Sequence, residues 1–236
     1  MKKIITTIAF IALSTVSVKA IEMPNLSFFS LTAGIASNES VWGADAEEKS
    51  FNEAGVFVSK NRASGVFTDD FTSQFIELGI GKYVSIGYDH TPDGVSTPTN
   101  SSREGDATET TVQADFDNID TTYIKLNIPG GAYIKAGTLD TDVDVKSQTS
   151  SGNVYKGKFA ITGQSYGIGY ERHLGETGFG MRFETNYIAL DDIKSDNGVA
   201  LTGGTAANGG RNEVAINDLE GLTARVAITY TFSRNN

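Results

Sequence analysis

The feature that most constrains this chain is a strict two-residue alternation near its C-terminal end. Between Leu222 and Phe232, apolar or aromatic residues occupy every second position, and the positions between them hold threonine, arginine and one alanine. Side chains of a β-strand point alternately to its two faces, so the segment predicts a strand with one apolar and one mostly polar face. Its length also matches a tilted strand that crosses a bilayer.

Similar alternation recurs in seven earlier segments, namely 29–35, 74–80, 84–88, 122–128, 132–136, 166–170 and 179–187. Short turns at 81–82, 129–131 and 174–178 join six of these segments into hairpins. Long polar connections at 37–72, 90–118, 140–163 and 191–220 alternate with the short turns, as in outer-membrane barrels. We therefore predict an all-β fold, an eight-stranded antiparallel up-and-down transmembrane β-barrel with four long outer loops.

The long loops hold most of the acidic residues, and two parts of them differ from the rest. Gly55 to Val58 is expected to extend the sheet above the membrane, and 201–210 is expected to be a mobile loop tip rich in small residues.

The first twenty residues read as a signal peptide. Lys2 and Lys3 precede an apolar stretch that is too short to span a membrane, and Val18-Lys19-Ala20 ends on a small residue. We predict cleavage after Ala20 and a mature barrel domain at 21–236, with an uncleaved anchor as the alternative. Cleavage moves the formal charge from −10 to −13 because three lysines are lost. Such a charge disfavours nucleic-acid binding.

The eight strands separate charge from apolar residues. Their apolar faces carry no charged residue, whereas the opposite faces carry Glu77, Asp89, Lys125, Lys135, Glu171, Arg182, Glu184 and Arg225. Arg or Lys facing lipid near the midplane would cost about 2–4 kcal/mol each. The interior of an eight-stranded barrel is just filled by side chains, so charges placed there must pair. We predict an inner network of paired charges; the alternative is a soluble two-sheet sandwich with the charges outside.

The signal peptide, the hairpin-spaced strands, the charged inner faces and the aromatic-rich last strand together resemble small outer-membrane proteins of the opacity/OmpX/OmpA-barrel type. The stretch from Phe75 to Tyr88 also looks like small barrel proteins from marine Gram-negative bacteria. The resemblance implies export to the cell outer membrane, contact with lipid and lipopolysaccharide, and recognition of terminal aromatic residues by the barrel assembly machinery. Tyr230 and Phe232 are the matching residues, although four further residues follow Phe232.

One group of residues suggests chemistry. His90 follows the third strand beside Asp89 and near Ser96, which is a loose match to a hydrolytic triad; a loop histidine is the simpler interpretation. His173 is expected at the periplasmic rim.

Two further motifs are incomplete. Asp140 to Asp144 opens like a calcium loop but has Val145 and Ser151 where glycine and glutamate are required. The glycines around 167–169 and 178–180 lack the rest of a nucleotide motif and are better explained as room for large neighbours. We therefore expect no catalytic, cofactor or metal site, and no enzyme.

The expected function is a structural or surface-interaction role, in adhesion or protection, performed by a barrel whose interior is plugged by paired charges. A narrow porin-like channel for small solutes is the first alternative, and a lipid-modifying enzyme is the second. The sequence leaves open the ligand of the outer loops, the passage of solutes, the oligomeric state and divalent-cation binding.

Overall fold

The structure is a computed structural model that describes residues 28–52, 54–104, 108–149, 158–198 and 210–232. These residues form an all-β fold. The strands are β1 (Phe29–Phe51), β2 (Phe57–Ile80), β3 (Val84–Thr91), β4 (Val95–Ser96), β5 (Asn100–Glu104), β6 (Thr108–Asn127), β7 (Ala132–Thr149), β8 (Lys158–His173), β9 (Phe179–Leu190), β10 (Ile193–Asp196) and β11 (Asn212–Phe232). Within the described ranges, no helix has the length and apolarity needed to cross a membrane.

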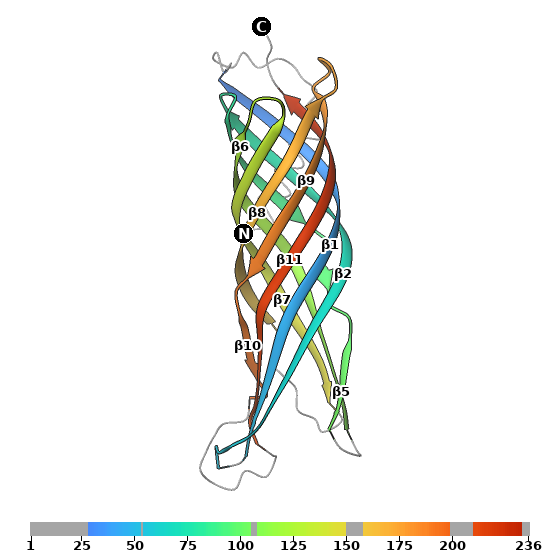
Figure 1. The fold of residues 1–236 in the computed structure, drawn as a ribbon, viewed down its shortest axis with the longest axis vertical. Helices are drawn as coiled ribbons and strands as arrows, with labels where there is room; N and C mark the ends of the chain where they lie inside the picture. The colour runs from blue at the N-terminus through green and yellow to red at the C-terminus, as the bar shows by residue number, and fades with distance from the viewer. Residues whose placement is uncertain (1–27, 53, 105–107, 150–157, 199–209, 233–236) are drawn as a thin grey trace.

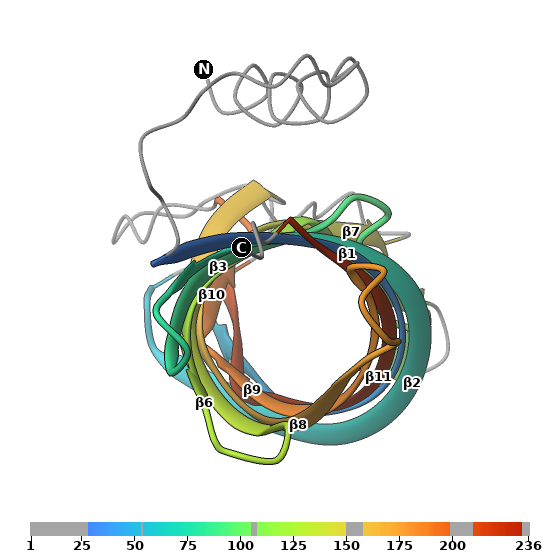
Figure 2. The same ribbon diagram turned by 90° about the horizontal axis from the view of Figure 1, so that it is seen from above.

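Eight of the strands close into a ring. Antiparallel pairing runs through β1, β2, β3, β6, β7, β8, β9 and β11, and β11 then pairs with β1 from Leu31↔Phe232 onward. Figure 2 looks into the resulting cylinder. The other three strands are short additions at one end, since β4 and β5 pair with β6 and β10 pairs with β11. The predicted eight-stranded antiparallel barrel is therefore confirmed.

The register of the ring fixes the tilt of the strands. Paired residues followed once around the ring from Ala33 return to β1 at Gly43, a displacement of 10 residues. With a rise of about 3.3 Å per residue and a strand spacing of about 4.8 Å, this displacement gives a tilt of about 40°. Each residue then advances about 2.5 Å along the barrel axis.

An apolar belt surrounds one half of the cylinder. It consists of exposed, outward-pointing side chains that include Leu31, Ile35, Leu78, Ile86, Ile124, Leu126, Ile134, Ile168, Phe183, Leu222, Val226, Ile228 and Phe232. Along β11 the belt runs from Leu222 to Phe232, which corresponds to about 25 Å, the height of the apolar band of an outer-membrane barrel. The three short turns lie at the edge of this half, at the upper end in Figure 1.

The strands continue far beyond the belt, and here the predicted loop boundaries are wrong. β1 and β2 have 23 and 24 residues, whereas a tilted spanning strand needs about 9–11. Much of the four connections expected to be loops is therefore strand, which Figure 1 shows running on toward the lower end. We call this extension the outer stem; it comprises residues 42–52, 54–71, 95–104, 108–119, 139–149, 158–163, 188–198 and 210–221. The expected mobile tip at 201–210 lies almost wholly outside the described residues.

The outer stem reverses the polarity of the membrane half. Its inward side chains form an apolar core of Trp42, Val95, Ala114, Phe116, Ile119, Leu139, Val143, Ile161, Ile188, Ile193 and Leu219. Acidic side chains such as Asp45, Asp70, Asp140 and Asp142 are exposed around it. This is the arrangement of a water-soluble protein, and it lets the strands leave the membrane without exposing an apolar face.

Candidate functional site

The interior of the barrel gathers the charged residues into two layers within the membrane half. All eight inward-pointing charges predicted from alternation lie inside the cylinder. Seven of them are buried, and Glu171 is the partly buried exception. Each layer contains two acids and two bases, so each is formally neutral. The layer nearer the short turns holds Glu77, Glu171, Lys125 and Arg182, and the layer nearer the stem holds Asp89, Glu184, Lys135 and Arg225.

Glu77 is the centre of the first layer. Arg182 binds it through two parallel contacts, Nη1 to Oε1 at 2.7 Å and Nη2 to Oε2 at 2.8 Å. Lys125 Nζ lies 2.7 Å from Glu77 Oε2 and 3.1 Å from Glu171 Oε2, and Arg182 Nη2 also reaches Glu171 at 2.9 Å. Arg182 is 0% exposed, so this bidentate pair is fully removed from water. A bidentate contact of this kind offsets much of the free-energy cost of removing the two ions from water.

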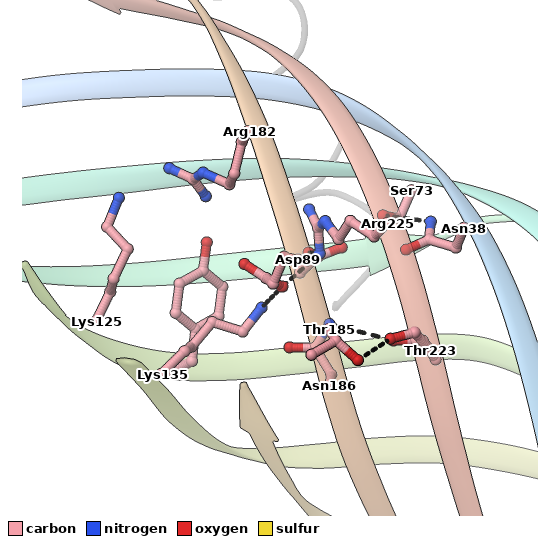
Figure 3. Close-up of polar contacts among 12 residues, drawn as sticks. Asn38, Ser73, Asp89, Lys125, Lys135, Arg182, Thr185, Asn186, Thr223 and Arg225 are labelled. Carbon is pink, nitrogen blue, oxygen red and sulfur yellow. Dashed lines mark hydrogen bonds and ion pairs between the residues drawn. The ribbon is translucent and has the colours of Figure 1, made fainter. Parts of the chain in front are cut away.

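Glu184 has the same role in the second layer. Lys135 Nζ lies 2.7 Å from Glu184 Oε1. Arg225 Nη1 lies 3.5 Å from the same Glu184 oxygen and also forms an ion pair with Asp89. Figure 3 shows Arg225 beside Asp89 and Lys135, with Arg182 and Lys125 further along the barrel. Lys125 and Lys135 are direct cross-strand neighbours, yet each lies against a different glutamate. The repulsion between the two lysine ammonium groups is therefore offset by the attraction of each to its own glutamate.

Aromatic side chains fill the space between the charges. Tyr123 donates a hydrogen bond to Glu77 at 2.8 Å, and Tyr133 donates one to Glu184 at 2.6 Å. The guanidinium carbons of Arg182 and Arg225 lie 4.6 Å and 4.8 Å from the ring centroid of Phe75. The two-residue alternation puts both tyrosines on the same face as Lys125 and Lys135, but the sequence analysis did not include them in the network. The sequence did hold an indication of this role, because each tyrosine precedes a predicted inner lysine by two positions and so shares its face.

Two glycines show how tightly this region is packed. A β-carbon added at Gly169 would lie 2.3 Å from the ring of Tyr133, and one added at Gly87 would lie 2.3 Å from the ring of Tyr123. Both positions face inward, so the absence of a side chain there makes room for a tyrosine of the network. The interpretation of the glycine at 169 as space for a large neighbour therefore agrees with the geometry.

A neutral polar layer separates the charges from the apolar core of the stem. Asn38 donates to Ser73 Oγ at 3.2 Å, and Asn186 donates to Thr223 Oγ1 at 3.2 Å. These four residues are labelled in Figure 3 on the stem side of Arg225. Trp42 donates through Nε1 to Ser40 Oγ at 2.9 Å, which joins this layer to the core. Along the axis, the lumen is thus filled by charges, then neutral polar groups, then apolar side chains.

The core of the stem is closely packed. A cavity in this core, lined by residues including Trp42, Phe116 and Leu139, has a volume of about 10 Å³. This is about the space of a single water molecule.

The histidine candidate forms a different arrangement from the one predicted. His90 Nδ1 lies 2.7 Å from Asp120 Oδ1, which also accepts a hydrogen bond from Tyr88 at 2.6 Å. Asp89 points into the barrel and pairs with Arg225, so the adjacent carboxylate faces the opposite side of the strand from His90. The backbone amide of Ser96 binds Asp69 at 3.0 Å. The triad of His90, Asp89 and Ser96 is therefore not assembled.

The calcium-like segment and the second histidine do not form a functional site in the structure. Asp140, Asp142 and Asp144 lie within β7, where extended backbone replaces the tight loop that calcium needs. Among the described residues, no group of three or more His, Cys, Asp or Glu could hold a metal ion. His173 ends β8 at the short-turn edge and is exposed. Ala20 and Ser151 lie outside the described residues.

The closed cylinder, the apolar belt and the neutralised interior define the class to which this chain belongs: it is a small β-barrel of the outer membrane. No protein-family model and no curated protein matches the sequence. Its fold is similar to the crystal structure of the outer-membrane protein OprG from Pseudomonas aeruginosa, with a TM-score of 0.51, 10% identity, and coverage of 87% of this chain and 96% of that one. At this identity the likeness concerns the fold alone.

Two other barrels are less similar in shape. The outer-membrane protein AlkL in DMPC bilayers matches with a TM-score of 0.41, 10% identity, and coverage of 86% of this chain and 92% of that one. The outer-membrane protease OmpT from Escherichia coli matches with a TM-score of 0.37, 9% identity, and coverage of 91% of this chain and 99% of that one.

Proposed function

We propose that this protein has a structural or surface-interaction role, in which the membrane barrel anchors a rigid stem outside the cell. The observation that carries this proposal is the continuation of the strands beyond the belt around an apolar core of their own. A densely packed stem resists deformation, because each of its strands is hydrogen-bonded to at least one neighbour and the space between them is filled by apolar side chains. The stem therefore suits the presentation of a fixed surface at a distance from the membrane.

The filled lumen supports this role over that of a channel. Two charge layers, a neutral polar layer and the apolar core follow one another along the axis. A solute moving along it would have to displace paired ions such as Arg182 and Glu77, and then separate the side chains around Trp42. Eight-stranded barrels have little interior space even without such a plug.

Planar-bilayer recording of refolded protein tests the absence of a channel. We expect no stable stepwise conductance from the unmodified barrel. Reproducible steps that scale with the amount of inserted protein would refute the proposal and favour the narrow porin-like channel.

Labelling on intact cells tests the display of the stem. The chain has no cysteine, so a single introduced thiol can be followed. We expect Val66→Cys, on the outward face of the stem, to react with a membrane-impermeant maleimide. The matched variant Glu176→Cys, in an exposed short turn, should react only after the outer membrane is permeabilised. Equal labelling of both variants, or the reverse order, would contradict the topology.

The partners and the absence of enzyme activity also belong to the proposal. We infer that lipid and lipopolysaccharide surround the belt, and that Tyr230 and Phe232 serve the barrel assembly machinery. The two rings lie 4.7 Å apart between centroids in an edge-to-face contact at the end of β11, where an assembly factor can reach them. The separation of Asp89 from His90 supports a role without catalysis.

A further inference from the structure

An asparagine–glycine pair, Asn197 and Gly198, lies in the outer stem directly after β10. This four-residue strand is labelled in the lower half of Figure 1. Glycine has no β-carbon, so its backbone nitrogen can closely approach the side chain of the residue before it. In this pair the side-chain amide of Asn197 is therefore open to attack by the backbone nitrogen of Gly198.

Hydrogen bonds hold both the backbone and the side chain of Asn197 in place. Its backbone amide donates to the carbonyl of Asn212 at 3.1 Å, which continues the pairing of β10 with β11 by one residue. Its side-chain Nδ2 donates to the carbonyl of Gly210 at 3.1 Å. The amide group is thus confined to a narrow range of orientations beside Gly198, and such confinement favours a reaction between neighbouring groups.

The carboxylate of Asp196 is shared between two donors. Its Oδ1 accepts from the backbone amide of Gly198 at 2.7 Å, and its Oδ2 accepts from Arg211 Nη2 at 3.1 Å. A general base has to lie within about 2.6–3.2 Å of the atom whose proton it takes, so Asp196 is placed to deprotonate the Gly198 nitrogen.

The direction of this hydrogen bond leaves the attacking side of the nitrogen open. The N–H bond of Gly198 lies in the plane of its peptide group. The nitrogen attacks through electrons above or below that plane, so a carboxylate that accepts the proton does not block its approach to a side-chain carbon. Asp196 can therefore remove the proton while the Gly198 nitrogen reacts with Asn197.

We propose that Asn197 and Gly198 form a self-modifying site, in which Asn197 loses its side-chain amide and Asp196 serves as the base. The Gly198 nitrogen forms a bond to Cγ of Asn197 while its proton passes to Asp196. The bond between Cγ and Nδ2 then breaks, and the proton moves from Asp196 to the departing nitrogen, which leaves as ammonia. Water opens the resulting five-membered succinimide ring to aspartate or isoaspartate, so water is the only co-reactant.

The product changes the contacts at the end of β10. The donor to the Gly210 carbonyl is lost, and a carboxylate oxygen takes its place against that carbonyl. The added charge also lies next to a group that already has two acids for one base, since Arg211 contacts Asp196 at 3.1 Å and Glu213 at 3.0 Å. Ile193, at the start of β10, is only 3% exposed within the core. Modification therefore loosens the end of the strand and leaves its start anchored.

Peptide mapping by mass spectrometry tests the site in the full refolded barrel, incubated in neutral buffer. Deamidation replaces an amide by an acid and yields an isoaspartyl form that chromatography separates. We expect Asn197 to react faster in the folded barrel than in the same chain unfolded in urea. The sequence has a second asparagine–glycine pair, Asn208 and Gly209, which follows Ala207 and lies outside the described residues. Its reaction in the unfolded chain is the positive control for the assay.

Two variants test the base. Asp196→Asn can still accept the hydrogen bond of Gly198 but takes no proton, so modification of Asn197 should slow about tenfold or more. Glu213→Gln is the matched control, because it removes the other acid beside Arg211 and leaves the contact between Asp196 and Gly198 in place; the rate should not change. Heat-modifiable migration verifies that each barrel is folded, and Asp196→Ser repeats the test if Asp196→Asn does not fold.

Asn197→Asp tests the consequence by installing one product directly. Amide exchange at the end of β10 should become about fivefold faster, because a hydrogen bond is lost. Three outcomes would overturn the assignment of the site: an unmodified Asn197 in the folded barrel, a slower reaction there than in the unfolded chain, or an unchanged rate in Asp196→Asn. Unchanged exchange in Asn197→Asp would overturn the loosening of β10. None of these results alters the conductance or labelling experiments.

Discussion

Removal of the Arg182 guanidinium is the sharpest test of the filled interior. Arg182→Met keeps most of the side-chain length but deletes two contacts with Glu77, at 2.7 Å and 2.8 Å, and one with Glu171 at 2.9 Å. The two carboxylates are then left with Lys125 as their remaining cation. The layer acquires an unpaired negative charge in a region from which water is excluded.

The magnitude follows from this uncompensated charge. Breaking a buried ion pair by removing one partner costs about 3–5 kcal/mol. Glu77→Gln should cost a similar amount, because it leaves the same layer with an excess positive charge. The double variant restores neutrality, so its loss of unfolding free energy should be well below the sum of the two single losses. We expect a coupling energy of at least about 2 kcal/mol in this double-mutant cycle.

Urea unfolding of the barrel in lipid vesicles measures these differences. Heat-modifiable migration reports the closed barrel, and fluorescence of Trp42, the one tryptophan of the chain, reports the core of the stem. Phe183→Leu serves as a control, since Phe183 is an exposed residue of the apolar belt next to Arg182. Additive losses in the double variant, or an Arg182→Met barrel within about 0.5 kcal/mol of the unmodified protein, would refute the inner charge network.

Three other predictions follow from particular positions. Gly169→Val should destabilise the barrel by about 1–3 kcal/mol in the same urea assay because it overlaps the ring of Tyr133, whereas the outward Ile168→Val should cost clearly less. Hydrogen bonding from Lys60, with the neighbouring cations, lowers the pKa of the Glu47 carboxyl to about 2. A lowered pKa stabilises the folded β1–β2 hairpin around Glu47 at neutral pH, and this contribution is lost as pH falls from about 4.5 toward about 2. The protection of backbone amides around Glu47, measured relative to their intrinsic exchange rates, should therefore fall over that range, and Glu47→Gln should remove the step. Mass spectrometry of the mature protein should find Ile21 at its N-terminus, and any other start would contradict cleavage after Ala20.

The membrane half of the fold was predictable because its pattern is local. Along β11 and β9, the apolar residues recur at every second position without interruption. The facing direction of Arg182 or Arg225 follows from that period alone. The short turns were equally clear, since their glycines and the proline at 129 interrupt two alternating runs.

The outer stem was missed because polar residues occupy both faces of the positions that lead into it. Ser37, Asn38, Glu39 and Ser40 follow one another in β1, so the apolar period disappears where the strand leaves the membrane. Asn38 and Ser40 point inward into the neutral polar layer, a place that a single strand does not reveal. The inward apolar residues that follow, such as Trp42, are widely spaced and acquire meaning only when the ring closes around them.

The candidate histidine site failed for a different reason. Asp89 is adjacent to His90 in sequence, but consecutive side chains of a strand point to opposite faces. The carboxylate that reaches His90 belongs to Asp120 on the neighbouring strand β6. Strand neighbours depend on register, which the turn sequences alone did not determine across the long connection between β3 and β6.

The sequence by itself determined which side chains of the membrane half face lipid and which face inward, because that choice depends only on a two-residue period. It also determined that the inner charges balance. Only the tertiary structure decided which charges meet, since Arg182 and Glu77 are separated by 105 positions and come together through the closure and tilt of the ring. Tertiary packing also turned much of the four presumed loops into a stem, because strands with polar outer faces become stable once their few apolar residues share one core.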